Sequence, residues 1–541
     1  MLRDIVIALS LSNLCFVSAW RALLSPKTAD YYYYWKSYTG LIEFAALVID
    51  VLLLAALFLL AITIIRRSGS ALLMKLARWA FLLLLIIPLN DLRTQINFLH
   101  GPRLAGLLGR AGLVVLGLLI LALGAFVIWR WRERVVRVAV AAVLMLSPFV
   151  LVALGQAAWL AFKYGRPVAF AEHIAPALPQ KQEGNGATPR VLWLIFDEMD
   201  ERLSFSERPS TINLPELDRL RGEAIFATNA SSPTPFTQRS IPSFVTGREV
   251  SRATPVSPDK LLVTFQGSRE RVDWGTCPNI FSEARERGLN TAVVGWFHPY
   301  CRIIGNSLTY CAWEAASTVF GPEKTSLTKN MLAHVRNLLL SVPLAWRVLP
   351  LTKKEEDVRQ RHISDYLSIL EKAKKVATDT SLSMILVHWP IPHAPYIYDH
   401  SKASLSSTAQ SSYLDNIELV DRTLGELRRT MESAGVWDST TVLLTADHGW
   451  RTEMWRNSTA MDRSLFWTKG DVATARGLSG KTNRRIPFIL KLAGQKEGVT
   501  YDQSFNTIIT HDLFLALLGG ELTSPESVVQ WLDRHRPTEE K

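Results

Sequence analysis

The sequence predicts a two-part protein, with an N-terminal bundle of about five transmembrane helices and a soluble α/β domain whose mostly parallel sheet is sandwiched by helices. The chain has 541 residues, which is too long for one ordinary core. Long apolar segments are confined to its first part, whereas short apolar and amphipathic segments alternate in the rest. We therefore expect a transmembrane domain at 1–165, a linker at 166–189 and a soluble domain at 190–535.

Composition and charge limit the classes of partner. The formal net charge is +11, and much of the excess lies beside apolar segments, which favours contact with anionic lipid headgroups. No RNA- or DNA-binding signature is present, so we expect no nucleic acid partner. The four cysteines are too few for a disulfide framework.

Each predicted span is an apolar segment near the twenty or so residues that a membrane-crossing helix needs. The first lacks a small-residue cleavage site, so we interpret it as an anchor rather than a removed signal peptide. The segments are 5–22, 41–65, 72–89, 111–129 and 138–162.

An odd number of spans places the two ends of the chain on opposite sides of the membrane. Two basic clusters fall on one side, which we take as cytoplasmic, although the opposite loops are basic as well. These clusters are Arg66, Arg67, Lys75 and Arg78, then Arg130, Arg132, Arg134 and Arg137. The aromatic run 31–35 suits the outer interface of the membrane. Asp50 in the second predicted span is either a paired structural acid or a functional one.

The linker is indicated by prolines and glycines among polar residues. In the soluble half, apolar runs of strand length alternate with segments of helical periodicity. We expect strands at 190–196, 224–228, 289–295, 383–387, 440–445 and 486–490, and helices at 214–220, 280–287, 411–434 and 511–518.

Acids and histidines follow four of these strands. In open α/β sheets the carboxyl ends of parallel strands meet at one edge, so these side chains are expected to converge on a shared metal site. Each motif taken alone also fits an ordinary turn or a structural histidine. The residues are Asp197 and Glu198, His298, His393, and Asp447 with His448.

A loop at 231–247, rich in hydroxyl side chains, enters a predicted helix. Hydroxyl groups there often cap the helix. The alternative is a nucleophile at a helix N-terminus, where backbone N–H groups favour anions. Thr237 is the candidate nucleophile.

Taken together, these motifs resemble the sulfatase branch of the alkaline phosphatase superfamily over residues 190–520. The resemblance is carried by Asp197, the segment from Thr237 to Gly247, the segment from Gly295 to His298, His393, and the segment from Ala446 to Gly449. Apolar spans before such a domain resemble lipid A phosphoethanolamine transferases and lipoteichoic acid synthases. That resemblance implies a multi-pass protein of the cytoplasmic membrane with its catalytic domain in the periplasm or outside the cell.

The resemblance implies metal ligands at Asp197 or Glu198, Thr237, Asp447 and His448. One divalent metal is expected, Zn²⁺ first, with Mn²⁺ or Ca²⁺ as alternatives. Thr237 occupies the position at which sulfatases carry a cysteine or serine that matures to formylglycine, which threonine cannot do. Residues 450–467 contain no histidine, which speaks against a second metal site.

The remaining polar residues have supporting roles in this interpretation. His393 and His298 could hold phosphoryl oxygens or protonate a leaving alkoxide. Arg485 is either a counter-charge for the substrate or an ordinary surface arginine, and His388 is expected to support its loop. Cys301 and Cys311 could form a disulfide in an oxidising compartment, or stay reduced and buried.

The predicted function is transfer of a phosphoethanolamine- or phosphoglycerol-like group from a membrane phospholipid donor to an envelope glycan or lipid acceptor, with Thr237 as nucleophile. A sulfatase-like hydrolase of sulfate or phosphate esters is the enzymatic alternative. A non-catalytic membrane protein that keeps the fold as a binding module is the alternative of another class.

Overall fold

A computed structural model of the chain describes residues 1–541 except 25–31, 36, 39, 96–100, 165–167, 170–172, 179–188, 317–325, 341–353, 409, 453–467, 479–483 and 537–541. Much of the predicted linker 166–189, and most of the histidine-free stretch 450–467, therefore lies outside the described residues. The chain forms two compact units. The helical unit comprises Met1–Thr28, Ser37–Val168 and Glu323–Thr352, and the α/β unit comprises Ala29–Lys36, Ala169–Pro322 and Lys353–Lys541.

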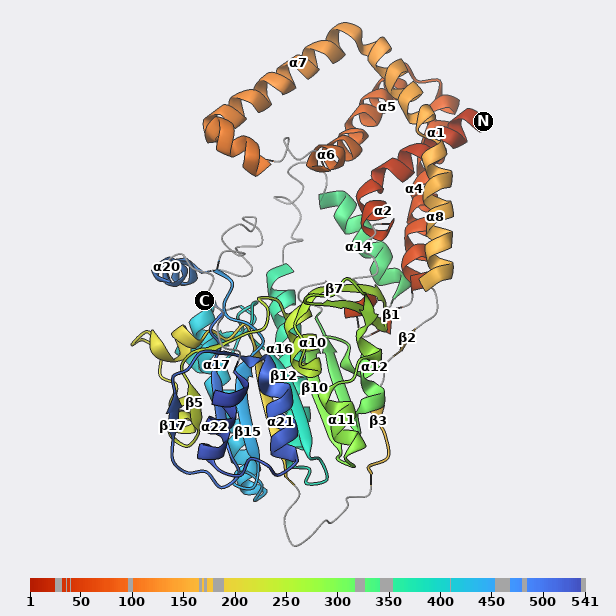
Figure 1. The fold of residues 1–541 in the computed structure, drawn as a ribbon. Helices are drawn as coiled ribbons and strands as arrows, with labels where there is room; N and C mark the ends of the chain where they lie inside the picture. The colour runs from red at the N-terminus through yellow and green to blue at the C-terminus, as the bar shows by residue number, and fades with distance from the viewer. Residues whose placement is uncertain are drawn as a thin grey trace. The chain divides into compact units, whose positions relative to one another are not determined.

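The α/β unit is built on one nine-stranded sheet, whose five central strands β15, β4, β12, β10 and β11 run parallel (Figure 1). These strands are apolar and buried along almost their whole length, because helices cover both faces of the sheet. Across the sheet the order is β17 (Val499–Tyr501), β5 (Ile225–Ala227), β16 (Phe488–Lys491), β15 (Thr441–Ala446), β4 (Val191–Asp197), β12 (Met384–Pro392), β10 (Thr291–Phe297), β11 (Tyr310–Ala315) and β3 (His173–Ile174).

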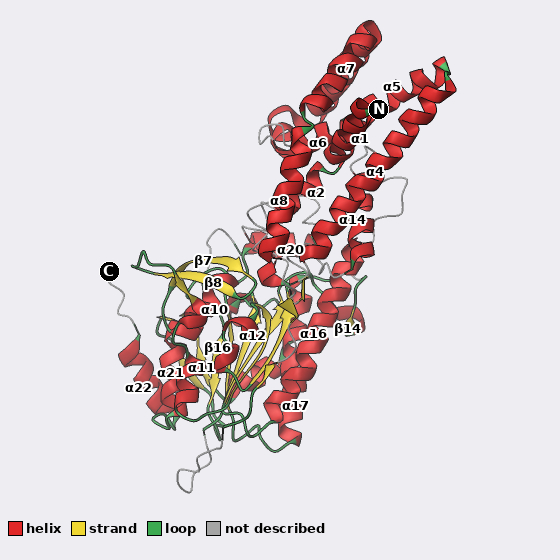
Figure 2. Ribbon diagram, turned by 90° about the vertical axis from the view of Figure 1, so that its right-hand side faces the viewer, coloured by secondary structure: helices red, strands yellow, loops and turns green. Residues whose placement is uncertain are grey.

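Helices pack on both faces of this sheet, as Figure 2 shows. One face carries α16 (Lys354–Thr378) and α17 (Tyr413–Ser433), with α9 (Pro215–Gly222) against α17. The other carries α10 (Thr237–Thr246), α11 (Ile280–Glu286) and α21 (Thr510–Leu518). The mostly parallel sheet between helices confirms the predicted fold of this half. All six predicted strands and all four predicted helices are present, with ends shifted by a few residues.

Smaller elements border the sheet. The three-stranded sheet joins β7 (Val250–Ser257), β8 (Lys260–Phe265) and β9 (Val272–Asp273), and two short pairs are β6 (Ala230–Ser231) with β18 (Phe505–Asn506) and β13 (Tyr398–Asp399) with β14 (Ser404–Leu405). Further helices are α12 (Tyr300–Ile303), α20 (Lys469–Gly477) and α22 (Pro525–His535).

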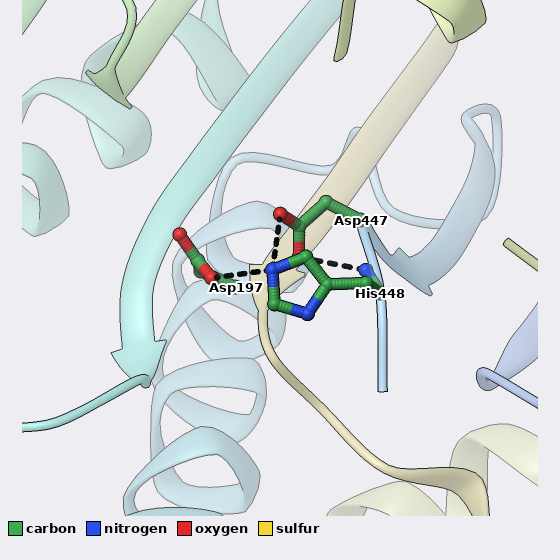
Figure 3. A group of neighbouring side chains, drawn as sticks. All are labelled: Asp197, Asp447 and His448. Atoms are coloured by element: carbon green, nitrogen blue, oxygen red, sulfur yellow. Dashed lines mark hydrogen bonds and ion pairs between the residues drawn. The ribbon is translucent and has the colours of Figure 1, made fainter. Parts of the chain in front are cut away.

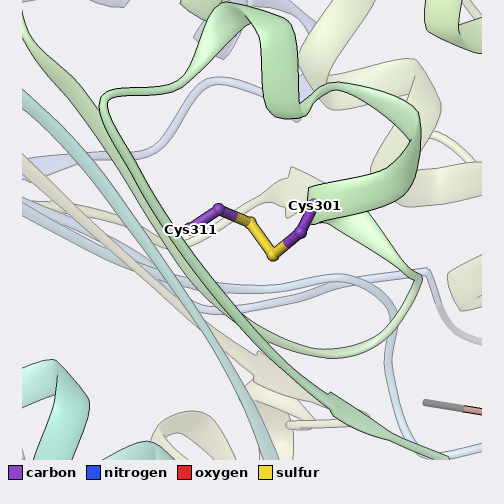
Figure 4. The surroundings of a disulfide bond; sticks show 2 residues. All are labelled: Cys301 and Cys311. Atoms are coloured by element: carbon purple, nitrogen blue, oxygen red, sulfur yellow. A yellow bond between two sulfur atoms is a disulfide. The ribbon is translucent and has the colours of Figure 1, made fainter. Parts of the chain in front are cut away.

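A disulfide between Cys301 and Cys311 ties α12 to β11, and its Cα atoms are 5.5 Å apart (Figure 4). The sequence left this pair open between a bridge and two buried thiols. Cys277 is a free, half-buried thiol.

The helical unit contains fewer candidate spans than predicted. Among the described residues, three helical stretches are long and apolar enough to cross a membrane, or four if the bent pair α1–α2 counts as one span. The predicted count of about five is therefore not confirmed. The helices are α1 (Leu2–Cys15), α2 (Val17–Leu24), α4 (Gly40–Ser68), α5 (Ala71–Leu84), α6 (Ile86–Gln95), α7 (Gly101–Met145), α8 (Pro148–Tyr164) and α14 (Leu327–Leu340).

One predicted span is missing at α7, whose backbone breaks from helical geometry at Gly109 and Trp131, and another counts only if the bent pair α1–α2 forms one span. The apolar helix Val115–Gly124 between these breaks is shorter than a bilayer requires, while the stretch Trp129–Lys163 counts as a single candidate span.

Asp50 has a partner inside the helical unit. His334 on α14 lies with its Nδ1 atom 2.9 Å from Asp50 Oδ2, and α14 packs against α4. Of the two predicted alternatives, the structure therefore shows the paired acid. α14 comes from the middle of the sequence of the soluble half, so the units interleave along the chain instead of following the contiguous predicted domains.

Candidate metal and nucleophile site

The site begins where two neighbouring parallel strands end. β4 and β15 pair in register with Phe196 opposite Ala446, so Asp197 and Asp447 follow at the same edge of the sheet. His448 comes next, and potential ligand atoms of these three buried side chains lie within 4.8 Å of one another (Figure 3). Of the four strand ends that were expected to converge on a metal site, these two supply the group.

Asp447 is held so that one of its oxygens faces the group. Its Oδ1 atom accepts hydrogen bonds from the backbone N–H groups of Glu198 (3.0 Å) and His448 (2.8 Å). Glu198 has a φ of 68°, an uncommon conformation for a residue with a side chain. Within the described part of the chain, Asp447 Oδ2 and Asp197 Oδ1 are buried and accept no hydrogen bond.

His448 is held in the tautomer that suits a metal ligand. Its Nδ1 atom lies 2.9 Å from the carbonyl oxygen of Gly449. A carbonyl can only accept, so Nδ1 carries the proton and Nε2 offers its lone pair. Nε2 lies 3.3 Å from Asp447 Oδ2 and 3.7 Å from Asp197 Oδ1.

The hydroxyl of Thr237 reaches the same group from α10. Thr237 Oγ1 lies 3.2 Å from His448 Nε2 and donates to Asp197 Oδ2 at 3.5 Å. Thr237 is the first residue of the helix, after the extended Phe236, so it lies at the positive end of the helix dipole. That position favours a negatively charged ligand or transition state.

Burial dominates the electrostatics of the site. Burial, followed by the charges of Asp447 and Glu198, raises the pKa of Asp197 well above its usual value. Burial also lowers the pKa of His448 well below its usual value and keeps the imidazole neutral. Two acids beside a neutral imidazole disfavour having both carboxylates charged unless a cation joins them.

Glu198, the alternative first ligand, lies beside this group rather than in it. Its Oε1 atom accepts hydrogen bonds from the backbone N–H (3.2 Å) and Nε (3.3 Å) of Arg451. Burial opposes ionisation of Glu198, but the charges of Arg451 and His393 outweigh it and lower the pKa. The structure therefore favours Asp197 as the acidic ligand from this strand end.

His393 lies at the edge of the site. Its Nδ1 atom is 2.6 Å from the carbonyl oxygen of Ala394, and its Nε2 atom is 4.0 Å from Glu198 Oε2. Burial lowers the pKa of His393. Its predicted part in binding or protonating the substrate stays a prediction.

His298 has a different environment from the one expected of a group that binds substrate. Its Nε2 atom is 3.2 Å from the carbonyl oxygen of Thr237, and its Nδ1 atom is 2.9 Å from the hydroxyl of Tyr33. Both ring nitrogens are thus engaged by the protein. His298 is therefore bonded to the backbone of Thr237 at the start of α10, and its predicted part in binding or protonating the substrate stays a prediction.

Two further predicted residues are also in contact with acids. The Nδ1 atom of His388 is hydrogen-bonded to the hydroxyl of Tyr300 at 2.8 Å. Its Nε2 atom lies 3.8 Å from Asp197 Oδ2. Arg485 lies 3.8 Å from Glu201 Oε2 and is partly exposed.

Sequence reasoning missed Arg451, Tyr33 and Tyr413. Tyr413 donates its hydroxyl to the carbonyl oxygen of Glu198 (2.7 Å) and accepts from the backbone N–H of Asp200 (2.9 Å), which braces the turn after β4. Arg451 carries a usable signal, because it directly follows the segment from Asp447 to Trp450. Tyr33 and Tyr413 are distant in sequence and carry none.

The residues present fit a divalent cation. Two carboxylate oxygens without hydrogen bonds, an imidazole lone pair and a hydroxyl face one point, a donor set that suits Zn²⁺ or Mn²⁺. The part of the chain that the structure describes contains no lysine or arginine within ion-pair distance of Asp197 or Asp447. The second group of possible ligands, His400, Asp415 and Glu418, is partly exposed.

Comparison with known proteins agrees with this architecture. The sequence model of the Sulfatase family matches residues 189–519. No curated protein matches the chain significantly. Similar solved structures include a protein of glycosaminoglycan metabolism from Bacteroides thetaiotaomicron, at 15% identity and a TM-score of 0.42, over 64% of this chain and 82% of the other.

Two more similar solved structures have comparable sequence identity. A sulfatase from Pseudoalteromonas sp. has 16% identity and a TM-score of 0.40, over 62% of this chain and 69% of the other. The lipoteichoic acid synthase of Listeria monocytogenes has 14% identity and a TM-score of 0.35, over 63% and 76%. Because the family model covers more than half of the chain, the protein belongs to the sulfatase family and is a sulfatase-like hydrolase or transferase.

Proposed function

We propose that this enzyme transfers a phosphoethanolamine- or phosphoglycerol-like group from a membrane phospholipid to an envelope glycan or lipid, with Thr237 as the nucleophile. The observation that carries the proposal is the position of the Thr237 hydroxyl. It lies at a helix N-terminus, 3.2 Å from His448 Nε2 and 3.5 Å from Asp197 Oδ2. A hydroxyl that forms a covalent intermediate needs such an activating group beside it.

The reaction has two displacements. Thr237 Oγ1 forms a bond to phosphorus, the phosphorus–oxygen bond to the diacylglycerol breaks, and the hydroxyl proton passes through Asp197 Oδ2 to solvent. The leaving alkoxide takes up a proton and departs as diacylglycerol. An acceptor hydroxyl then loses its proton and forms the second bond to phosphorus, the bond between phosphorus and Thr237 Oγ1 breaks, and Oγ1 takes up a proton in its place. A divalent metal held by Asp197, Asp447 and His448 would supply charge stabilisation for the hydroxyl and the phosphoryl oxygens.

The residue type favours phosphoryl over sulfuryl chemistry. Sulfatases of the formylglycine type need a cysteine or serine where this chain has Thr237, and threonine cannot be matured in that way. A threonine ester of a phospho group, in contrast, needs no maturation. Hydrolysis, with water as the acceptor, is the second candidate, and membership of the sulfatase family favours it.

We also propose that the α/β unit faces the periplasm or cell exterior and that the helical unit is embedded in the cytoplasmic membrane. The apolar helices and the disulfide of the α/β unit support this, because disulfides persist in oxidising compartments. A C-terminal fusion to alkaline phosphatase should be enzymatically active. A C-terminal fusion to green fluorescent protein, which does not become fluorescent when exported unfolded, should be dark. The reverse pair of results would overturn the orientation.

A trapping experiment tests the transfer. Full-length enzyme is incubated with fluorescent phosphatidylethanolamine or phosphatidylglycerol, without acceptor, and its peptides are analysed by mass spectrometry. We expect fluorescent diacylglycerol to be released in about one equivalent and the matching phospho-substituent to appear on the peptide that contains Thr237. Steady release of free phosphoethanolamine or phosphoglycerol would instead identify a hydrolase. Turnover of p-nitrophenyl sulfate, but of neither phospholipid, would refute phosphoryl transfer.

A further inference from the structure

Residues 32–35, here called the 32–35 segment, lie between the first two apolar stretches of the sequence but belong to the α/β unit. The aromatic run that contains them was expected at the membrane interface. The structure corrects this, since all four side chains are almost completely buried: Tyr32, Tyr33, Tyr34 and Trp35. Tyr33 and Tyr34, although remote in sequence, are thus part of the hydrophobic core of the α/β unit.

The 32–35 segment is anchored by contacts that do not involve the hydroxyl of Tyr33. The guanidinium group of Arg302 donates to the carbonyl oxygens of Tyr32 and Trp35. The ring of Tyr34 packs edge-on against Phe297, with centroids 4.8 Å apart. Removing the Tyr33 hydroxyl should therefore leave the segment in place.

The hydroxyl of Tyr33 completes the hydrogen bonding of His298, whose tautomer is set by Thr237. His298 Nε2 lies 3.2 Å from the carbonyl oxygen of Thr237, which can only accept, so Nε2 carries the proton. Nδ1 then has a lone pair, and Tyr33 Oη donates to it at 2.9 Å. Burial lowers the pKa of His298 to about 3, so the ring is neutral and has only this one proton.

A second hydrogen bond joins the same segment to the same helix. Gln238 donates from Nε2 to Tyr34 Oη at 2.8 Å. Gln238 directly follows Thr237, so the first two residues of α10 are both tied to the 32–35 segment, one through His298 and the other directly.

We propose that Tyr33 is a positioning residue for the nucleophile, acting through His298 on the backbone of Thr237. The inference rests on the proposed role of Thr237. The Thr237 hydroxyl must lie between His448 and Asp197, and its backbone sets where it points. A displacement of about 1 Å at a reacting group can cost on the order of 100-fold in rate.

The kinetic test uses the full-length protein in detergent and bis(p-nitrophenyl) phosphate as the probe. Tyr33→Phe should lower kcat about 10-fold with KM little changed, since it moves the nucleophile and leaves the substrate contacts alone. The matched control is Tyr501→Phe. Tyr501 is also a buried tyrosine of the α/β unit, and its hydroxyl donates to Asp533 at 2.9 Å on an edge strand, so kcat should not change.

A double-mutant cycle separates positioning from general packing. If Tyr33 acts through His298, Tyr33→Phe should cause no further loss in a His298→Ala background. Additive losses, or an unchanged kcat in Tyr33→Phe alone, would overturn the proposal.

Backbone hydrogen exchange measures the stability of the start of α10 directly. It requires neither an active enzyme nor a His298 variant that folds. Tyr33→Phe should speed exchange in the peptide that covers the start of α10, and Tyr501→Phe should not. Equal exchange in wild type and Tyr33→Phe contradicts the positioning role. If exchange changes but Thr237→Ala retains the wild-type rate, the proposed function fails while the link from Tyr33 to the helix stands.

Discussion

Two buried carboxylates that are three residues apart in sequence have opposite environments. Asp200 and Asp197 are both fully buried. The carboxylate of Asp200 receives two hydrogen bonds from the Arg202 guanidinium, Nε at 3.1 Å and Nη2 at 3.0 Å, and a third from the Arg202 backbone N–H. Asp197 instead approaches Asp447 and neutral His448, and Oδ1 accepts no hydrogen bond within the described structure.

The difference separates stability from function. A buried carboxylate needs a compensating cation, and the chain provides one for Asp200 in the form of Arg202. Asp197 and Asp447 have no such cation within the described chain, so both carboxylates can be ionised together only if a bound ion supplies the compensating charge. We infer that the first arrangement maintains the fold and the second is kept for chemistry.

The largest expected effect is the loss of turnover on removing the Thr237 hydroxyl, which lies beside Asp197 and His448. Thr237→Ala should lower turnover of any accepted phosphoester at least about 1,000-fold, because no group remains to form the covalent intermediate. Melting temperature and bound metal should change little. Thr246→Ala is the matched control, since that hydroxyl donates to the Pro242 carbonyl at the other end of α10. Wild-type turnover by Thr237→Ala would remove this loop from the mechanism.

Breaking the ion pair between Asp200 and Arg202 should lower the free energy of unfolding without affecting metal binding. Arg202→Met leaves Asp200 buried without its cation, which costs about 3–5 kcal/mol of unfolding free energy. Denaturation of the full-length protein in detergent measures it. Arg208→Met is the control, because Arg208 pairs with the partly exposed Asp218 at 2.7 Å and should cost less than about 1 kcal/mol. Equal losses in the two variants would argue against the comparison.

Altering Asp197 or Asp447 should instead weaken metal binding and leave the free energy of unfolding almost unchanged. Asp447→Asn keeps an acceptor for the backbone N–H groups of Glu198 and His448 but removes one anionic ligand, so metal affinity should fall at least about 100-fold, or about 2.8 kcal/mol. Metal titration followed by elemental analysis measures this change, with Asp200→Asn as the variant expected to keep full affinity. Stoichiometric, undiminished metal binding in Asp447→Asn would exclude Asp447 as a ligand.

The smallest effect concerns a third buried carboxylate, Asp421 on α17, which accepts from the backbone N–H of Leu217 at 2.8 Å. Burial raises its pKa from 3.8 to about 6. Because the folded state holds this proton more tightly, the stability contributed by Asp421 is full below about pH 4 and falls as pH rises toward 6. Asp421→Asn should therefore be more stable than wild type at pH 7.5, by at most about 3 kcal/mol.

That gain should shrink as the pH approaches 4, where Asp421 is protonated in both the folded and unfolded states. Thermal unfolding at a series of pH values checks the trend. A constant difference between Asp421→Asn and wild type at all pH values would show that ionisation of Asp421 is not its cause.

The parts that could be predicted from sequence are those in which local pattern and tertiary role agree. β4 and β15 are uninterrupted apolar runs followed by acids, and α17 repeats apolar residues at helical spacing. Because parallel strands end at one edge, this was enough to bring Asp197, Asp447 and His448 together before any coordinates.

The parts that could not be predicted depend on backbone geometry or distant contacts. The positive φ of Glu198 directs its carboxylate toward Arg451, and no sequence pattern marks that conformation. Tyr33 reaches His298 from more than 260 positions away. The break at Trp131 falls among the charged residues that separate two predicted spans, but hydropathy does not show that the apolar helix before it covers only Val115–Gly124, and this length changes the number of candidate spans.

The interleaving of the two units has a consequence for biosynthesis. The 32–35 segment leaves the ribosome before almost all of its neighbours in the α/β unit, and α14 is made only after β11. Each unit therefore contains segments that are separated in the sequence by segments of the other unit, so neither unit can fold fully before the other has been partly synthesised. The early tyrosines must wait, without their partners, until His298 and Gln238 have been synthesised. An expression fragment that starts at the linker would therefore lack the 32–35 segment of the α/β unit and would contain α14 without the rest of the helical unit.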